Sequence, residues 1–188
     1  MQLGKTLYVA DRKAWRAWLS RHYRKEKDVW LVYYKKASGK PRIPYNDAVE
    51  EALCFGWIDS IVKKVDDERF AQRFSPRRRG SVLSQMNRER IRKLISEGRM
   101  TRAGLAAVSH AFKAGAADAF VFPKRILDAI RKDRAAWENF KKMPEGYKRI
   151  RIAYIKGRRH QGEGAYRKSL ANFIRMTTKN RRFGFVRE

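Results

Sequence analysis

Residues suited to β-strands are confined to one short part of the chain, residues 28–74. The segment DVWLVYYKK (residues 28–36) is rich in β-branched and aromatic side chains, which favours a strand. The segments WIDSIVKKV (residues 57–65) and RFAQRF (residues 69–74) flank the acidic tip DDE, and Phe70, Gln72 and Phe74 alternate along one face. These patterns predict one strand and a hairpin, and hence a small antiparallel sheet.

The rest of the chain carries apolar residues at helical spacing. We expect helices after Asp11, over residues 46–56, from Ser81 or Ser84 to Glu97, and from Thr101. In the third of these helices, the residues expected to face the core are Leu83, Ile91, Leu94 and Ile95. Beyond Pro123 every pattern is helical. The predicted fold class is α+β: a small antiparallel sheet with flanking helices in residues 1–118, followed by a helical module in residues 119–188.

Positive charge dominates the composition. The chain has 46 Lys and Arg against 19 Asp and Glu, a formal net charge of +27, with an isoelectric point near 10.8. Such an excess attracts polyanions over a Debye length. Nucleic acid is the partner we expect, because it is the commonest cytoplasmic polyanion. The sequence has no zinc finger and no RNA-recognition signature, so we expect binding to the backbone and not to specific bases. An anionic membrane surface is the second candidate partner. In the alternative without a function, the high charge reflects only the general amino-acid composition of the source organism's proteins.

Metal, cofactor and nucleophile chemistry find no support in the sequence. The histidines His22, His110 and His160 are isolated, and the single cysteine, Cys54, rules out an intrachain disulfide. We therefore predict no metal, no cofactor and no catalytic residue. No long apolar run resembles a signal peptide or a membrane span, so the expectation is a cytoplasmic protein. The sequence does not give the oligomeric state.

An anion site is predicted where the hairpin joins the next helix, in RFSPRRRGSVLSQMN. Three consecutive arginines precede Gly80 and a serine at an expected helix start, where unpaired N–H groups favour anions. Guanidinium groups add bidentate contacts to phosphate. The candidates are Arg73, Arg77, Arg78, Arg79, Ser81, Ser84 and Asn87. In the alternative interpretation these arginines form a solvated loop or neutralise Asp66, Asp67 and Glu68.

A second hypothesis is a small-ligand protein or an enzyme. In this interpretation Trp57 and Asp59 of the GWID motif line a polar pocket at the sheet edge, together with Arg73 and Arg77. An acid and arginines on neighbouring strands would converge on a polar ligand. The hypothesis requires Asp59 to lie in a concave pocket.

Four segments resemble a known family: VWLVYYKK, EALCFGWID, FSPRR and GRMTRAGL. They are similar to the YdeI / OmpD-associated family, also described as bacteriocin-protection proteins, with an N-terminal part like the YjbR/CyaY fold. The resemblance implies an α+β fold, a helical end module from FPKRILDAIRK onward, and a role in stress or antimicrobial-peptide tolerance, without an assigned reaction. The chain departs from the pattern at Leu83, where a Trp is expected, and at Gly162–Gly164, where a Glu-Thr-Arg run is expected.

Overall fold

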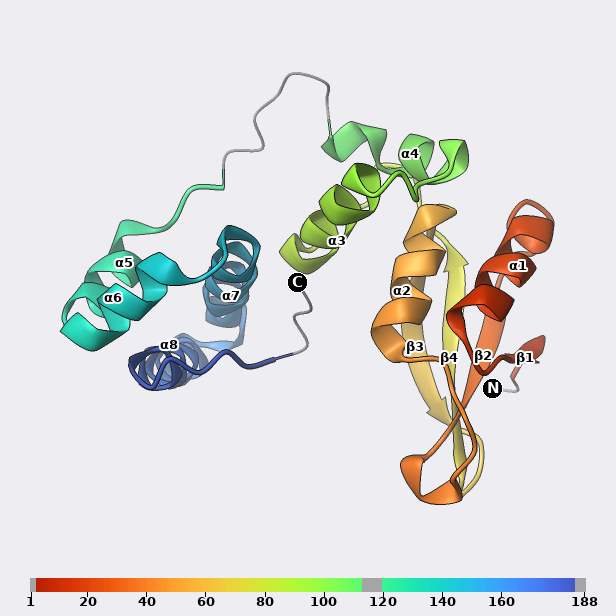
Figure 1. The fold of residues 1–188 in the computed structure, drawn as a ribbon, viewed down its shortest axis with the longest axis horizontal. Coiled ribbons are helices and arrows are strands. Elements are labelled where there is room, and N and C mark those ends of the chain that lie inside the picture. The colour runs from red at the N-terminus through yellow and green to blue at the C-terminus, as the bar shows by residue number, and fades with distance from the viewer. Residues whose placement is uncertain (1–2, 113–119, 185–188) are drawn as a thin grey trace. The chain divides into compact units, whose positions relative to one another are not determined.

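Four strands form a single mixed sheet in the computed structural model, which describes residues 3–112 and 120–184 (Figure 1). Its order is β1 (Thr6–Tyr8), β2 (Val29–Tyr34), β4 (Arg69–Pro76) and β3 (Trp57–Lys64). The β2–β4 and β3–β4 pairs are antiparallel, which confirms the predicted strand and hairpin, whereas β1 runs parallel to β2. β1 was not predicted, because three residues are too few to show alternation.

The chain forms two compact units. The first comprises residues 1–83 and 90–116, and the second comprises residues 84–89 and 117–188. The predicted boundary between residues 118 and 119 lies outside the described residues. The α+β fold class is confirmed: the sheet and its helices belong to the first unit, and four helices make up most of the second.

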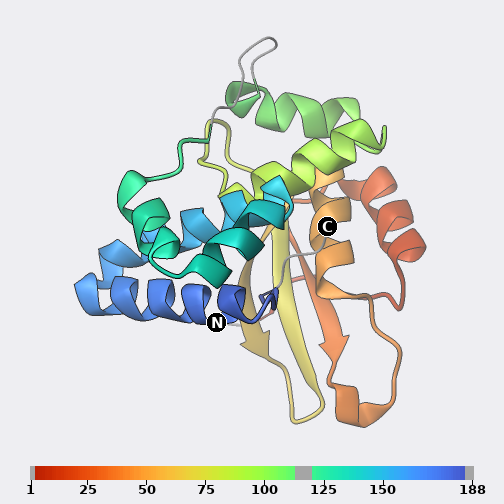
Figure 2. The ribbon, with the colours of Figure 1, turned by 60° about the vertical axis from the view of Figure 1, so that its left-hand side comes forward.

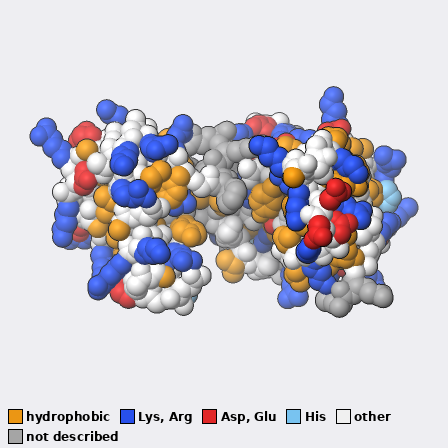
Figure 3. All heavy atoms as spheres, turned by 90° about the horizontal axis from the view of Figure 1, so that it is seen from below, with side chains coloured by type: hydrophobic (Ala, Val, Ile, Leu, Met, Phe, Trp, Pro, Cys, Tyr) orange, Lys and Arg blue, Asp and Glu red, His pale blue; other side chains and the backbone are white. Residues whose placement is uncertain are grey.

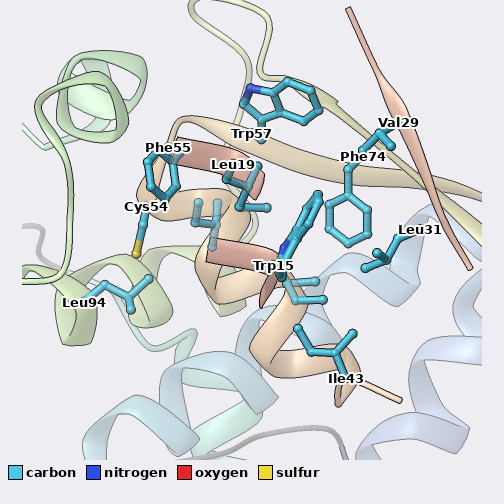
Figure 4. Packing of buried hydrophobic residues seen from close by; sticks show 14 of the residues in the cluster. Trp15, Leu19, Val29, Leu31, Ile43, Cys54, Phe55, Trp57, Phe74 and Leu94 are labelled. Atoms are coloured by element: carbon cyan, nitrogen blue, oxygen red, sulfur yellow. The ribbon is translucent and has the colours of Figure 1, made fainter. Parts of the chain in front are cut away.

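The main core lies between the sheet and two helices, α1 (Arg12–His22) and α2 (Tyr45–Cys54) (Figure 1). Trp15 is fully buried there, its ring centroid lies 5.4 Å from that of Phe74, and its indole N–H donates to the carbonyl of Ala48 at 3.0 Å (Figure 4). Burying each such side chain contributes about 1.5–3 kcal/mol. The short 3₁₀ helix η1 (Lys36–Ser38) follows β2.

The opposite face of the sheet carries a smaller apolar cluster. Trp30, Val32 and Ala71 are buried there, and Leu3 and Val65 pack against them. Successive strand residues point to opposite faces, so Arg73, which is paired with Trp30 in the register, lies on this face and not on the helix-covered one. The predicted alternation of Phe70, Gln72 and Phe74 is thereby confirmed.

Two further helices complete the fold around the end of α2: α3 (Gln85–Ser96) and α4 (Arg102–Val108), the latter continued by η2 (Ser109–Ala111). The hydroxyl of Ser84 accepts a bond from the backbone N–H of Asn87 at 3.3 Å, so Ser84 and not Ser81 caps α3. Leu83, Ile91 and Leu94 are buried as expected. Ile95 is 42% exposed, and its prediction as a core residue was wrong.

Three arginines from distant parts of the chain converge on one buried carboxylate. Glu51 on α2 has no exposed side-chain surface and accepts bonds from Arg12 (2.5 Å), Arg16 (2.6 Å) and Arg99. Burial alone would lower the pKa of Arg12 and Arg16, but the hydrogen bonds and charge of Glu51 outweigh it and raise the pKa of both groups. The network ties α1, α2 and the turn between α3 and α4 together.

The second unit is built from α5 (Lys124–Arg131), α6 (Arg134–Lys142), α7 (Glu145–Gly157) and α8 (Glu163–Thr178), with η3 (Arg158–Gln161) before α8 (Figure 2). Its core joins residues of all four helices: Ile126, Ile130, Ala136, Phe140, Tyr147, Ile152, Tyr166 and Phe173. Asp133 caps α6 by accepting from the N–H of Ala136 at 2.9 Å. That cap separates α5 from α6, so Trp137 and Phe140 belong to a new helix that begins at Arg134.

The two outer strands of the sheet are irregular or short. β1 has three residues, and β3 has a bulge between Asp59 and Val62. Ile61 and Val62 are about half exposed at this bulge, and Lys63 and Lys64 follow them. A bulge interrupts the regular row of backbone groups that an edge strand offers, and the charge of lysines on the edge disfavours pairing with another strand.

Candidate functional site

The arginine run forms a tight loop between β4 and α3. The N–H of Arg77 donates to the carbonyl of Gly56 at 2.9 Å, which fixes the start of the loop against the turn between α2 and β3. The N–H of Ser81 then donates to the carbonyl of Arg78 at 3.1 Å, closing a turn. Gly80 has a φ of +74°, which only glycine adopts readily, so this residue type is required at the turn.

Arg77 is a half-buried cation without a carboxylate partner in the described part of the chain. One terminal nitrogen, Nη2, donates to the hydroxyl of Ser81 at 2.9 Å and to the carbonyls of Ser81 (3.3 Å) and Val82 (3.2 Å). Its Nε is buried and has no hydrogen-bond partner among the described residues. Burial lowers the pKa of Arg77. A charge withdrawn from water without a counter-charge is costly, so the site favours an anion.

A hollow of about 580 Å³ lies beside this arginine. Its described wall contains no acidic residue and is formed by Arg77, Arg79, Ala106, Ala107, Ser109 and His110. A ring nitrogen of His110, Nε2, lies 3.0 Å from the carbonyl of Ser81. Arg78 and Arg79 are exposed, and neither forms an ion pair within the described residues. The hollow therefore presents two guanidinium groups and an imidazole to solvent without a competing carboxylate.

Of the seven predicted anion-binding residues, the structure brings three to the hollow. Arg77 and Arg79 line it, and Ser81 lies beside them through its bonds to Arg77 and His110. Arg78 lies on the same loop, turned to solvent. Ser84 and Asn87 belong to the start of α3 and bond to each other, so they do not join the site.

Arg73 requires a correction. Its guanidinium donates to the carboxylate of Asp28 at 2.6 and 3.1 Å on the face of the sheet that carries Trp30. Its charge is compensated there, and it takes no part in the hollow.

The acids at the hairpin tip do not account for the arginine run. Asp66 pairs with Arg69 at 2.5 Å, and Asp67 pairs with Lys64 at 2.5 Å. Both partners lie on the hairpin itself. Within the described residues no ion pair joins residues 77–79 to Asp66, Asp67 or Glu68, so the structure does not support the interpretation in which the arginines neutralise these acids.

The alternative pocket around Trp57 and Asp59 does not form as predicted. Trp57 is 1% exposed and packs in the core, with its indole N–H donating to the carbonyl of Tyr23 at 3.2 Å. Asp59 accepts from the hydroxyl of Tyr45 at 2.9 Å and from the amide of Gln72 at 2.7 Å. Burial, followed by the charge and hydrogen bond of Asp59, raises the pKa of Tyr45 to about 12.

Strand alternation explains this second correction. Gln72 and its neighbour Arg73 must point to opposite faces of β4, and Arg73 pairs with Asp28. Asp59 and Arg73 consequently cannot converge on one ligand. Within the described residues, no group of three or more His, Cys, Asp and Glu is placed to hold a metal ion.

His110 is the residue of the site that the sequence did not indicate. It lies 29 residues beyond Ser81 and belongs to no recognisable motif. Its position depends on how η2 follows α4, and α4 is placed by the packing of Gly104 directly against the carbonyl of Cys54. This contact, together with the bonds of the Thr101 N–H and hydroxyl to the same carbonyl, places residue 110 near the loop.

Comparison with protein families gives one match. A model described as "Domain of unknown function (DUF8412)" matches residues 7–107. The chain belongs to the DUF8412 family. The DUF8412 match includes the arginine loop and most of α4, and it ends before His110 and before the four helices of the second unit. Searches of the curated proteins and of the solved structures found no match. The resemblance to the YdeI / OmpD-associated family stays a prediction.

Basic side chains are spread over the surface. Figure 3 shows Lys and Arg side chains over much of the face in view, whereas acidic side chains gather in a few places. None of the described helices combines the length and the apolar character needed to cross a lipid bilayer.

Proposed function

We propose that the protein binds the phosphate backbone of nucleic acid, with the loop of residues 77–79 and its hollow as the principal contact. The observation that supports this most strongly is the half-buried guanidinium of Arg77, which has no carboxylate partner in the described residues and an unused buried Nε. A phosphate oxygen would supply the missing counter-charge. The net charge of +27 would raise the local concentration of the polymer around the site.

Each residue has a separate role in this proposal. Arg77 holds the loop through Ser81 and Val82 and contributes its charge to the wall of the hollow. Arg78 and Arg79 extend into solvent, where their guanidinium forks would contact successive phosphates. Trp15, Trp30 and Trp57 are buried, so these rings are not available as stacking platforms for bases. Binding is therefore expected to depend on the backbone and not on base sequence.

The test is a fluorescence-anisotropy titration with labelled single- and double-stranded oligonucleotides at several salt concentrations. If about six phosphates are engaged, affinity should fall by ~10³-fold between 50 and 200 mM salt. The variant to compare is Arg78→Ala/Arg79→Ala, because Arg77→Ala would also release the loop from Ser81 and Val82. We expect this double variant to bind at least about tenfold more weakly.

Two further variants make the result specific. Lys35→Ala/Lys36→Ala removes the same charge from exposed positions elsewhere in the first unit and should have a much smaller effect. Arg78→Lys/Arg79→Lys keeps the charge but not the fork, and intermediate affinity would support bidentate contacts. If the two double-alanine variants lose the same affinity for the oligonucleotides, the loop contributes only to the overall positive potential of the protein and is not a specific contact. A flat salt response would refute the proposal.

The cellular setting of this activity is also proposed here. We infer a cytoplasmic protein whose polyanion binding serves stress or antimicrobial-peptide tolerance, as the resemblance to the bacteriocin-protection proteins suggests. Vesicles containing anionic lipid, titrated in parallel, separate a nucleic-acid partner from a membrane surface. Absence of binding to both would refute the proposal and leave a small anionic ligand in the hollow beside Arg77 as the candidate to test.

A further inference from the structure

A second cationic hollow lies within the second unit, outside the part of the chain that the DUF8412 model matches. It has a volume of about 470 Å³ and is walled by α5 and α8. Its α5 residues recur at i, i+1, i+4, i+5 and i+8, so they form one face of that helix. Four basic side chains and one acidic side chain of the wall give it a net charge of +3; they are Lys124, Arg125, Lys132, Arg167 and Asp128.

The cations of this hollow are only partly compensated. Arg125 and Arg167 share a single oxygen, Oε1 of Glu163, at 3.1 and 3.4 Å. Lys124 and Lys132 form no ion pair within the described residues. Asp128 forms an ion pair with Arg131 at 3.0 Å and does not neutralise the lysines. The wall therefore has an unmatched positive charge at each end.

A buried hydroxyl without a partner marks the same hollow. Tyr166 lines it, is 1% exposed, and has a hydroxyl that forms no hydrogen bond within the described residues. The guanidinium carbons of Arg125 and Arg159 lie 5.7 and 4.5 Å from the centre of its ring. Buried hydroxyls in proteins are nearly always bonded, and an unbonded one calls for an explanation such as a missing ligand.

We propose that this hollow binds a condensed phosphate, the pyrophosphate group of a small molecule. Lys124 begins α5 and Lys132 caps its end, eight residues and about 12 Å along the helix axis from each other, so their long side chains suit an elongated anion better than a single phosphate. The Tyr166 hydroxyl is shielded in the free protein, so it would donate to a phosphate oxygen once the Arg125 side chain over its ring moves aside. Ala129 and Leu170 provide an apolar part of the wall for whatever the pyrophosphate is attached to. This activity goes beyond the backbone binding proposed for the first unit and does not depend on it.

The test is isothermal titration calorimetry of the full chain at low salt with EDTA present, using inorganic orthophosphate, inorganic pyrophosphate, AMP and ADP. We expect pyrophosphate to bind at least about tenfold more tightly than orthophosphate, since each added charge-assisted hydrogen bond is worth about that factor. Tighter binding of ADP than of pyrophosphate would identify the ligand as a nucleotide. Tighter binding of pyrophosphate than of ADP would identify it as a free condensed phosphate. Equal affinity for orthophosphate and pyrophosphate, or binding of neither, overturns the proposal.

Variants assign the binding to the hollow. Lys124→Ala/Lys132→Ala should lose at least about tenfold in pyrophosphate affinity, whereas Lys142→Ala/Lys168→Ala, with the same charge change at exposed positions of this unit, should change little. Tyr166→Phe should weaken binding by about tenfold without lowering the thermal midpoint of the free protein, because its hydroxyl has no partner to lose. An equal loss of pyrophosphate affinity in both lysine variants would refute the assignment of the site to this hollow.

One control separates this proposal from the first. The Arg78→Ala/Arg79→Ala variant changes a loop in the first unit and should keep the pyrophosphate affinity of the unmodified chain. If nucleic-acid binding fails while pyrophosphate binding remains, only the proposal for the first unit is lost. If the loop variant abolishes pyrophosphate binding, the hollow between α5 and α8 is not the site.

Discussion

Replacing Glu51 with glutamine should destabilise the first unit more than the same change at its neighbour Glu50. Glu51 is completely buried and accepts from three arginines, two on α1 and one in the turn between α3 and α4. Glu50 keeps part of its side chain exposed and, among the described residues, accepts from Arg12 alone, at 2.7 Å. The pair therefore compares one chemical change in two settings that differ in burial and in the number of partners.

The expected magnitudes follow from this difference. Removing one member of a buried ion pair costs about 3–5 kcal/mol, and the lower end applies because the three arginines keep between 27% and 38% of their side-chain exposure. We therefore expect Glu51→Gln to lower the free energy of unfolding by about 3 kcal/mol. For Glu50→Gln we expect about 1 kcal/mol, because Arg12 still has Glu51.

Urea unfolding followed by tryptophan fluorescence measures both variants. Four of the five tryptophans lie in the first unit, and Trp15 and Trp57 pack in its core, so the signal reports mainly on this unit. The difference between the variants should persist at high salt, because buried charges are weakly screened. Equal destabilisation by the two substitutions would refute the view that the three-arginine network holds α1, α2 and the following turn together.

Two other predictions concern packing and pH. Gly104→Ala would place a Cβ 2.2 Å from the carbonyl oxygen of Cys54, so we expect the free energy of unfolding in urea to fall by about 3 kcal/mol. The control Gly164→Ala, in open space on α8, should raise it by about 0.5 kcal/mol. An unchanged unfolding free energy for Gly104→Ala would contradict the close packing of α4. The raised pKa of Tyr45, about 12, means that its contribution to stability is complete below pH 10 and is lost as the pH rises through 12. Tyr45→Phe should flatten the decline in unfolding free energy over this interval, and an unchanged pH profile would contradict the contact with Asp59.

The elements that the sequence predicted are those with a repeating pattern. The strand at residues 29–34, the hairpin and the amphipathic helices all follow from side-chain periodicity, and the structure confirms them. β1 has too few residues to repeat, and its three residues are strand-like only because β2 pairs with them. The choice between Ser81 and Ser84 as the cap of α3 likewise depended on where Arg77 fastens the loop.

The site was only partly predictable for a related reason. The arginine run can be recognised in the sequence, but whether each guanidinium has a carboxylate partner depends on residues far along the chain. Arg73 meets Asp28 across the sheet, 45 residues away, whereas within the described residues the guanidinium of Arg77 meets only a hydroxyl and carbonyls. The partners of Glu51 lie 39, 35 and 48 residues from it, so the network was invisible in the helix that carries it.

The two irregular edges of the sheet have a consequence for crowding. Proteins that gather on a long polymer reach high local concentrations, at which exposed strand edges tend to pair and to grow into fibres. Here β1 offers only three residues, and the bulge of β3 breaks the row of backbone groups next to Lys63 and Lys64. Under the proposed function, copies bound side by side on one polyanion would therefore meet at edges that are poorly suited to extending a common sheet.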